Sequence, residues 1–570
     1  TDFQISISVD PKARTITVSD NGIGMNRDEL IENLGTIAQS GTSAFAKSLE
    51  QAQKGDINQI GQFGVGFYAA FMVAQMVEVT SRKAGTEEGW CWRSDGRGEF
   101  AIEEAEKTSR GTSITLYLKQ GEDEFLAPER LSTIIKLYSD HIALPILLDD
   151  DKEPVNRASA LWLRSKSDIT KEQYKEFYHH VAHAFEEPTL TLHWKAEGKI
   201  EYTSLLFVPG VKPYDLFDPK RRHGVKLYAK RVFITDEAEG LIPPYLRFLR
   251  GIIDSEDLAL NISREMLQNN PVLAKIRQGV TRRVLSDLAK LAKKKETYAT
   301  FWNNFGPVLK EGLYEDTENR EALLKILRCP STHDTEGLTS LNEYVERMKD
   351  GQEDIYYING DSKEALALSP HLEGFKERGI EVLLLTDTVD DFWPSAVGQF
   401  KDKNFKSVTR AGQDLDKVAP SKKKDKKEKD KTTQSDIDAL IALMKLTFGE
   451  AVKDVKTTDR LTGSPVCLAT ADTDIDIHLE RFLKQHGQLN ATTSRILEIN
   501  PDHPLIHKMA EKIGKKGAGK KDDSANAGAN ETLADLSWLL LDQARLMDGE
   551  TLEDPAAFSR RLGEVLAKVV

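Results

Sequence analysis

The sequence predicts a multidomain protein of the mixed α/β (α+β) class. Runs of alternating apolar residues, typical of half-buried strands, interleave with amphipathic helical runs along the 570 residues. A chain of this length exceeds what one hydrophobic core usually covers, so several domains are expected. Two low-complexity runs interrupt the pattern and indicate where the chain divides.

Composition limits the class of protein and its partners. The net charge of −13 disfavours a protein that mainly binds the phosphate backbone of nucleic acid. Cys91, Cys329 and Cys467 lack the spacing of a disulfide framework or zinc site, which favours a reducing, cytoplasmic location. The longest apolar run, GFYAAFMVAQMV, is too short to span a bilayer, and the first residues read as a strand, not as a signal peptide. We therefore expect neither nucleic acid nor a membrane as partner.

The first element is a predicted hairpin, ISISVD-PKAR-TITVSD, whose second strand ends at Asp20. A carboxylate at a strand end can accept a hydrogen bond from an exocyclic amine such as N6 of adenine. Gly22 and Gly24 would let the backbone turn and leave space for a flat base. Asn26 is then predicted to cap the helix RDELIENLGTIA, with Glu29 as its reciprocal partner.

Two further stretches would complete a nucleotide pocket. In IGQFGVGFYAAF, Gly61, Gly64 and Gly66 precede an apolar helix, where backbone N–H groups and the helix dipole favour phosphate. In RGTSITLYL, the step Gly111-Thr112 leads into an alternating strand. Each piece alone is also typical of close packing or an ordinary turn. Together with Asp20, and in this order, they indicate three walls of one pocket.

The segment between the first two pieces, from about residue 35 to residue 66, is expected to be a lid. Gly35 at its start and the Gly41-Thr42 step would provide hinges for closure over a bound nucleotide.

Two boundaries divide the chain into three domains, and a further low-complexity run lies inside the last of them. The mixed-charge run SKKKDKKEKDK at 421–431 predicts a solvated linker, and its interleaved acidic residues disfavour a basic patch for lipid or nucleic acid. The run KKGAGKKDDSANAGAN at 515–530 predicts a mobile loop, and DDDKEPVNR at 149–157 a softer boundary. The domains predicted from these boundaries are 1–148, 156–419 and 433–570.

The middle segment contains a candidate catalytic loop. VKLYAKRVFI and EVLLLTD predict buried strands, and KIRQGVTRRVLSDLAKLAKKK a long amphipathic helix. In LNISREMLQNN, Ser263 is a predicted N-cap, followed by Arg264 and, one turn later, Gln268. A guanidinium at a helix start suits a γ-phosphate, although this spacing alone is more typical of a surface salt bridge.

Other side chains in this segment have two interpretations. Trp162 and Phe217 could form apolar surface for unfolded polypeptides, or ordinary core packing. His179, His180 and His183 have helical spacing that could suggest a metal site. Since no matching set of carboxylates and cysteines accompanies them, a solvated or packed helix face is favoured.

The C-terminal segment predicts an association surface. Asp554-Pro555 would start a second helix after NETLADLSWLLLDQARLMDG. The apolar residues of the first helix exceed what two short helices can bury against each other, so a four-helix bundle with a second copy is expected, with docking onto the chain's own domain as the alternative. The apolar stripe comprises Leu533, Leu536, Leu540 and Ala544, widened by Trp538, Leu539 and Leu541.

The motifs DNGIGM, LGTIAQSGT, GQFGVGFY and RGT together resemble the nucleotide pocket of the GHKL ATPase superfamily, most closely bacterial members of the heat-shock protein 90 family. The resemblance covers essentially the whole chain and continues through YSDHIALPI, ALWLRSKSDIT, EYTSLLFVPG, GVKLYAKRVFI, YLRFLRGIIDSEDLALNISREMLQ, GIEVLLLTD and NPDHPL. It implies a two-layer α/β sandwich that binds nucleotide, an α/β middle domain and an α+β dimerisation domain.

The resemblance also implies roles for individual residues. Asp20 would hold the adenine amine, partly through water, and Arg264 would reach the nucleotide from the middle domain, with Gln268 as a second candidate catalytic residue. Gln39 stands where the family usually has lysine, so a positive contact to the nucleotide would be lost. The implied nucleotide-binding set is Asp20, Gly24, Met25, Asn33, Gln39, Gly64, Val65, Gly66, Phe67, Thr112 and Arg264.

Family members carry a strand and a helix before the position of Thr1. That helix bears the glutamate that activates water and the asparagine that helps hold magnesium. The sequence as given has neither, so its general base is expected to be absent and no protein ligand for a metal is assigned.

The function implied is that of an ATP-dependent molecular chaperone. It would be a homodimeric clamp joined through its C-terminal helices, using ATP and Mg²⁺ to bind and remodel unfolded or partly folded clients in the cytoplasm, with other chaperones as further partners. The alternative is a non-hydrolysing chaperone fragment that binds clients and dimerises. A histidine kinase or a DNA topoisomerase is disfavoured, because no phosphoacceptor-histidine helix precedes the pocket and the acidic chain lacks a basic track for duplex DNA.

Overall fold

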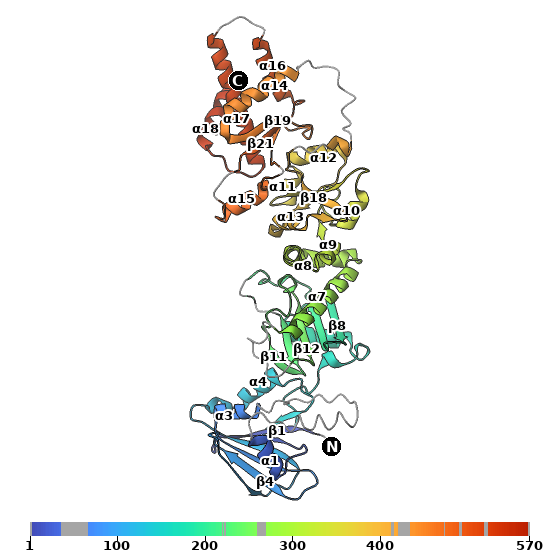
Figure 1. The fold of residues 1–570 in the computed structure, drawn as a ribbon, viewed down its shortest axis with the longest axis vertical. Helices are drawn as coiled ribbons and strands as arrows, with labels where there is room; N and C mark the ends of the chain where they lie inside the picture. Colours follow the sequence, from blue (N-terminus) through green and yellow to red (C-terminus); the bar gives the residue numbers. More distant parts are fainter. Residues whose placement is uncertain are drawn as a thin grey trace. The chain divides into compact units, whose positions relative to one another are not determined.

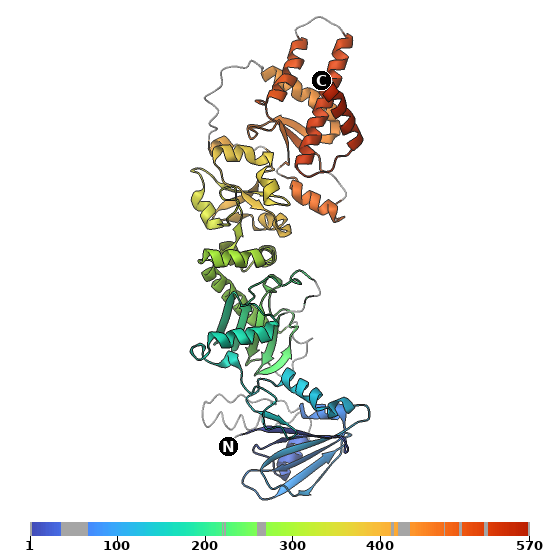
Figure 2. The ribbon, with the colours of Figure 1, turned by 180° about the vertical axis from the view of Figure 1, so that it is seen from behind.

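The computed structural model describes most of the chain, which forms two compact units, Thr1–Val284 and Leu285–Val570, each with its own sheets and cores (Figures 1 and 2). The predicted three-domain division stays a prediction. The described residues are 3–35, 66–218, 221, 224–258, 270–411, 415–419, 434–471, 473–489, 493–517 and 523–567.

The first unit begins with a seven-stranded sheet of order β5-β4-β3-β6-β2-β1-β7. Neighbouring strands are antiparallel except for the parallel pair β1 and β7, and the predicted hairpin is confirmed as β1 and β2. The strands are β1 (Ile5–Asp10), β2 (Thr15–Asp20), β3 (Ala74–Arg82), β4 (Gly89–Ser94), β5 (Phe100–Ala105), β6 (Gly111–Leu118) and β7 (Ile146–Leu148).

One face of this sheet carries the core and the other carries hydroxyl pairs. Leu30 of α1 and Leu131 of α4 are buried against the apolar face. On the opposite face the hydroxyls of Thr17 and Thr115 lie 3.1 Å apart. The alternation expected of half-buried strands is therefore met, and the layer arrangement is that of a two-layer α/β sandwich. The helices are α1 (Arg27–Leu34), η1 (Gly66–Ala69), α3 (Ala70–Val73), η2 (Asp123–Leu126) and α4 (Pro128–Tyr138).

The second sheet of this unit has the order β11-β10-β12-β9-β8, and every residue of β9 is buried. The buried strand predicted in VKLYAKRVFI is in fact a hairpin of two strands, β10 and β11, of which β11 is mostly half-buried, because the chain turns at residues 230–231. The elements are η3 (Leu161–Leu163), η4 (Lys166–Asp168), α5 (Lys171–Ala182), β8 (Leu190–Ala196), β9 (Tyr202–Val208), β10 (Val225–Ala229), β11 (Val232–Thr235), η5 (Pro244–Leu246) and β12 (Arg250–Ser255).

The two aromatic residues of this region that were considered as client-binding surface differ in burial. Trp162 is only 1% exposed and packs in the core with Phe177 and Tyr178, so the interpretation of Trp162 as client-binding surface was wrong. Its indole finds a partner inside the fold, because Nε1 donates to Asp254 Oδ2 at 2.8 Å, and burial follows from that satisfied polar group. Phe217 remains 53% exposed beneath the guanidinium of Arg247.

The long amphipathic helix predicted after the candidate catalytic loop is confirmed as α7 (Pro271–Leu291). In the second unit, the predicted strand in EVLLLTD is confirmed as β16, in a sheet of order β16-β15-β18-β17. The elements up to residue 419 are α8 (Lys295–Glu315), α9 (Arg320–Ile326), β13 (Arg328–Cys329), β14 (Thr339–Ser340), α10 (Leu341–Arg347), β15 (Asp354–Asn359), α11 (Lys363–Ala367), η6 (Pro370–Leu372), α12 (Glu373–Arg378), β16 (Leu383–Leu385), η7 (Thr388–Asp391), α13 (Trp393–Val397), β17 (Gln399–Phe400), β18 (Lys403–Ser407) and η8 (Leu415–Lys417).

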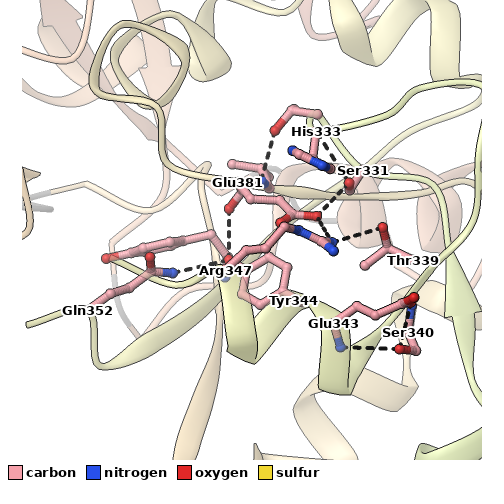
Figure 3. Close-up of polar contacts among 12 residues, drawn as sticks. Ser331, His333, Thr339, Ser340, Glu343, Tyr344, Arg347, Gln352 and Glu381 are labelled. Atoms are coloured by element: carbon pink, nitrogen blue, oxygen red, sulfur yellow. Dashed lines mark hydrogen bonds and ion pairs between the residues drawn. The ribbon is translucent and has the colours of Figure 1, made fainter. Parts of the chain in front are cut away.

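A polar cluster around Glu381 joins α10 to this sheet (Figure 3). The Glu381 carboxylate accepts hydrogen bonds from Ser331 Oγ at 2.6 Å and from Arg347 Nε at 2.9 Å and Nη2 at 2.8 Å. Tyr344 donates its hydroxyl to the Glu381 carbonyl at 2.7 Å. Because these groups satisfy one another, the cluster holds the fold together and is not a candidate site.

The C-terminal part of the second unit packs α14, α16 and α17 on the sheet β19-β21-β20. The loop predicted at 515–530, in this part of the chain, was partly wrong. The described residues of 515–530 extend α16 to Gly517 and begin α17 at Asp523, since the alanines of DSANAGAN favour helix. The elements are α14 (Gln434–Phe448), η10 (Gly449–Ala451), β19 (Val452–Thr457), β20 (Val466–Ala469), α15 (Ile477–Gln485), β21 (Arg495–Ile499), α16 (Pro504–Gly517), α17 (Asp523–Met547) and α18 (Pro555–Ala567). The predicted linker at 421–431 lies outside the described residues.

The apolar stripe of α17 is used mainly inside its own domain. Leu533 is 1% exposed and Leu540 is 3% exposed, both within the core that includes the three-stranded sheet. Docking onto the same domain therefore accounts for Leu533, Leu540, Leu541 and Ala544, while Leu536, Trp538 and Leu539 are only half-buried and their pairing with a second copy stays a prediction. The large hydrophobic side chains that remain exposed on α17 and α18 are Leu546, Met547, Leu562 and Leu566.

Candidate nucleotide-binding site

The pairing of three strands brings the first predicted site residues together. Ser19 on β2 lies opposite Ser113 on β6, and Thr112 lies opposite Ser81 on β3. Asp20, one residue beyond Ser19, therefore comes level with Thr112 where the strands end. The register thus juxtaposes two residues that are far apart in the sequence.

A glycine makes this juxtaposition close. Gly111 has φ +114°, and a Cβ at this position would lie 2.1 Å from the carbonyl oxygen of Asp20. Only glycine lets the two backbones approach in this way. The glycine of the RGT motif is therefore needed for the close backbone packing beside Asp20, and the same motif supplies Thr112.

The hydroxyl of Ser81 connects the walls of the site, and no sequence pattern pointed to it. Ser81 is fully buried; its Oγ accepts from the backbone N–H of Met25 at 2.8 Å and lies 2.9 Å from Thr112 Oγ1. It also donates to the carbonyl of Gly111 at 3.2 Å. One serine on β3 thus ties the turn after β2 to the start of β6.

The turn after Asp20 has the conformation that its glycines predict. Gly24 has φ +64°, and a Cβ there would lie 1.9 Å from the carbonyl oxygen of Arg82. The exposed carboxylate of Asp20 accepts from the backbone N–H of Gly22 through Oδ1 at 2.8 Å, which orients the side chain. The carboxylate therefore stands at the mouth of the turn with its direction fixed.

The helix after the turn begins with the predicted capping box. Asn26 Oδ1 accepts from the Glu29 N–H at 2.9 Å, and Glu29 Oε2 accepts from the Asn26 N–H at 3.0 Å. Burial raises the pKa of Glu29, but its hydrogen bonds with Lys83 and the Asn26 N–H outweigh this, so the pKa lies below its usual value. The carboxylate stays ionised at the helix N-terminus, where negative charge is stabilising.

Asn33 and Phe67 lie on the core side of the sheet. Asn33 Nδ2 lies 3.9 Å from the sulfur of Met25, which packs at the edge of the core beneath α1. The ring of Phe67 meets Trp92 edge-on at 5.6 Å between centroids, which anchors the backbone at Gly66. Of the predicted set, Asp20, Gly24, Met25 and Thr112 therefore meet at one end of the sheet, and Asn33 reaches them through Met25, whereas Phe67 packs against the middle of β4. Gln39, Gly64, Val65, Arg264 and Gln268, together with Ser263 and the predicted lid, lie outside the described residues.

Lys107 is a second residue that the sequence did not indicate. Its ammonium donates to Ser113 Oγ at 2.8 Å. Burial lowers the pKa of Lys107, while the nearby charge of Asp20 acts in the opposite direction. A cation therefore lies beside the strand end that carries the Asp20 carboxylate.

The histidines of α5 do not form a metal site by themselves. His179 Nε2 lies 3.2 Å from the carbonyl oxygen of Glu186, and His183 follows the last helical residue with φ 51°. Among the residues that the structure describes, no group of three or more His, Cys, Asp and Glu side chains could hold a metal ion.

Two protein-family models match this chain, one near its N-terminus and the other from residue 148 onward. A family described as "Histidine kinase-, DNA gyrase B-, and HSP90-like ATPase" matches residues 2–109, which hold the Asp20 turn, and the family "Hsp90 protein" matches residues 148–570. The chain belongs to the Hsp90 family.

Similar Hsp90 relatives extend over the full chain. Proteins named "Chaperone protein HtpG" are 55% identical in Paramagnetospirillum magneticum and 53% identical in Roseobacter denitrificans, covering 100% and 99% of this chain and 90% and 89% of the relatives. A third, from Rhodospirillum rubrum, is 51% identical over 99% of this chain and 90% of its own length. The chain is an ATP-dependent chaperone of the Hsp90 type, with an ATPase domain built on the seven-stranded sheet.

Proposed function

We propose that this Hsp90 chaperone recognises the adenine of ATP at the end of β2 and uses hydrolysis to drive a homodimeric clamp around client proteins. The observation that supports this most is the Ser81 hydroxyl, which links the Met25 N–H and Thr112 beside the Asp20 carboxylate. Hydrogen bonds within the chain hold these groups together at one end of the sheet, so little ordering is needed on binding.

The chemistry of Asp20 favours adenine over guanine. An ionised carboxylate accepts hydrogen bonds only, so it pairs with the N6 amine of adenine, partly through water. Guanine has a carbonyl oxygen at the equivalent ring position, and the two acceptors would repel each other. Gly24 and Met25 would line the base, and Thr112 would complete its hydrogen bonds.

The phosphates would lie toward the glycine-rich segment. Gly64, Val65, Gly66 and Phe67 would supply backbone N–H groups, as in other anion sites at helix starts, and Asn33 would reach the sugar or phosphate region. Gln39 would contribute a neutral contact. The described residues around Asp20 offer no set of carboxylates that fits Mg²⁺, so the ion would enter with ATP, held by phosphate and water.

Arg264 and Gln268 would act from the middle segment. A guanidinium can neutralise charge that develops on the γ-phosphate during transfer. The approach of Arg264 to the bound nucleotide would therefore couple the arrangement of the domains to hydrolysis. ATP would then shift populations of open and closed clamps, with no chemistry done on the client. Two copies would join through C-terminal surfaces, and the chaperone would bind unfolded or partly folded clients in the cytoplasm. The described helices include none with the length and hydropathy needed to cross a bilayer.

The test of this proposal is nucleotide affinity after a one-atom change. Asp20→Asn removes the negative charge and replaces one carboxylate oxygen with an amide nitrogen, which cannot accept from N6; we expect ADP affinity measured by calorimetry to fall about 10- to 100-fold, the worth of a charge-assisted hydrogen bond. Asp10→Asn is a matched control, because Asp10 Oδ1 also accepts from the N–H two residues later, that of Lys12, at 2.9 Å.

Unchanged affinity in Asp20→Asn would refute the adenine assignment. ATP turnover measured in parallel should fall in Arg264→Ala while ADP affinity remains. If turnover were equal in the parent chain and in Arg264→Ala, the role proposed for Arg264 would be wrong.

A further inference from the structure

A cavity lies in the first unit, on the sheet of β8 to β12. It has a volume of about 810 Å³, within the range of small-molecule sites. Its floor includes the buried side chains of Trp162, His193, Trp194 and Thr203, and Ile142 borders it from the segment after α4. None of its described lining residues belongs to the seven-stranded sheet or to the predicted nucleotide-binding set.

Positive side chains dominate the wall of this cavity. Five cationic residues line it against two carboxylates, those of Glu201 and Glu256. Of the cations, only Lys195 forms an ion pair among the described residues, with the exposed Glu197 at 3.4 Å. The acidic chain has thus gathered an excess of positive charge in one concave place. The cations are Arg164, Lys166, Lys195, Lys230 and Arg231.

Arg231 is the least satisfied of these cations. Its Nε is buried and has no hydrogen-bond partner, which is costly for a guanidinium unless an anion completes it. Its backbone is fixed, since its N–H lies 3.2 Å from both carboxylate oxygens of Asp254. Asp254 also holds the indole of Trp162 on the cavity floor at 2.8 Å. The wall is therefore held in place by hydrogen bonds within the chain.

A tight hairpin turn presents two of the cations. Lys230 and Arg231 form the two-residue connection between β10 and β11, with φ of 49° and 70°. Such turns favour Asn-Gly, because both positions require positive φ. Lys401 and Asp402 form the same kind of two-residue turn, with positive φ at both positions, between β17 and β18. Asn-Gly, the favoured pair for this turn, can therefore be substituted at either place.

We propose that this cavity binds a small, multiply charged oxyanion bearing phosphate or carboxylate groups. The excess of cations selects against positive and neutral ligands, and the volume suits a compact molecule. Lys230 and Arg231 clamp it at the hairpin, while Lys166 and Lys195 approach from η4 and β8. This site is separate from ATP binding and does not rest on the nucleotide proposal.

The experiment is lysine-resolved amine labelling of the full chain, with inorganic tripolyphosphate as the phosphate probe and citrate as the carboxylate probe. We expect labelling of Lys166, Lys195 and Lys230 to slow about tenfold at a saturating probe concentration, as burial under a bound anion implies. Lys175 and Lys290, which lie outside the cavity, should label at unchanged rates. Protection by tripolyphosphate alone assigns phosphate, and protection by citrate alone assigns carboxylate.

A charge-removing variant keeps the test independent of folding. Lys230→Asn with Arg231→Gly installs the favoured turn, so thermal stability should hold or rise while protection of Lys166 and Lys195 weakens about tenfold. Lys401→Asn with Asp402→Gly is the matched turn control and should keep full protection. Equal labelling with and without both probes, uniform slowing of every lysine, or full protection in the Lys230/Arg231 variant would each overturn the proposal.

Discussion

At the scale of single residues, the candidate site depends on a few hydroxyl groups and glycines. These residues matter because the register of the paired strands brings them next to one another. Asp20 and Gly24 were predictable because a carboxylate and glycines after a strand are unusual in sequence. Ser81 was not, because a serine within AQMVEVTSR looks like any strand residue. Its role appears only when β3 pairs with β6 and brings its Oγ to the Met25 N–H.

Removing the Ser81 hydroxyl should loosen the turn. In Ser81→Ala the buried N–H of Met25 loses its acceptor, at a cost of about 1–3 kcal/mol. We expect faster hydrogen exchange at the Met25 amide and weaker ADP binding. Ser113→Ala removes a hydroxyl from the opposite face of the sheet and should leave the Met25 amide protected. Equal exchange in both variants would show that Ser81 does not hold the turn.

Two glycines with positive φ provide a matched pair. Gly24→Ala would set a Cβ 1.9 Å from the Arg82 carbonyl oxygen, whereas a Cβ at Gly85, with φ +83°, meets nothing within 4 Å. Gly85→Ala should cost about 1–2 kcal/mol from backbone strain alone, and Gly24→Ala markedly more. Denaturant unfolding of the N-terminal sheet measures both. Similar losses would mean that the turn can move away from Arg82.

At the scale of elements, local signals predicted starts and caps better than ends. The hairpin, the Asn26 capping box and α7 follow from patterns within a few residues. The loop expected at 515–530 was partly wrong, because the alanines of its second half favour helix although its glycines and polar residues are typical of a loop. Burial of the α17 stripe depends on contacts with β20 and α14, which helical periodicity cannot specify.

The cap of α10 makes a pH-dependent contribution. Burial raises the pKa of Glu343, but hydrogen bonds with the N–H and hydroxyl of Ser340 and with Lys295 lower it to about 2. A depressed pKa stabilises the fold above the usual value of 4.5, and this contribution is lost as the pH falls toward 2. Glu343→Gln should therefore flatten the acid dependence of unfolding between these values. An unchanged acid profile would contradict the assignment.

At the scale of the whole molecule, family membership was predictable from motifs spread over the chain, and matches to residues 2–109 and 148–570 agree with it. What sequence could not supply is how segments distant in the chain join within a unit. In the second unit, His371 of η6 meets Asp548, just beyond α17, at 3.1 Å, with both side chains almost fully buried. Neither residue belongs to a motif.

This buried pair predicts alkaline sensitivity. Burial lowers the pKa of His371, but the charge of Asp548 and its hydrogen bond raise it to about 10. A raised pKa means that the stabilisation is complete below the usual 6.5 and is lost as the pH rises through about 10. We expect proteolysis after α17 to accelerate across that window. His371→Gln should be susceptible at every pH, and the exposed His333→Gln should behave as the parent chain. A parent profile without alkaline acceleration would refute this.

The burial of Leu533 and Leu540 within their own domain has a consequence for assembly. A fold that closes its core in a single copy does not need to unfold when its neighbour leaves. Protomers can therefore separate intact, mix with others in solution and re-form pairs, so subunit exchange costs only the surface that the partners share.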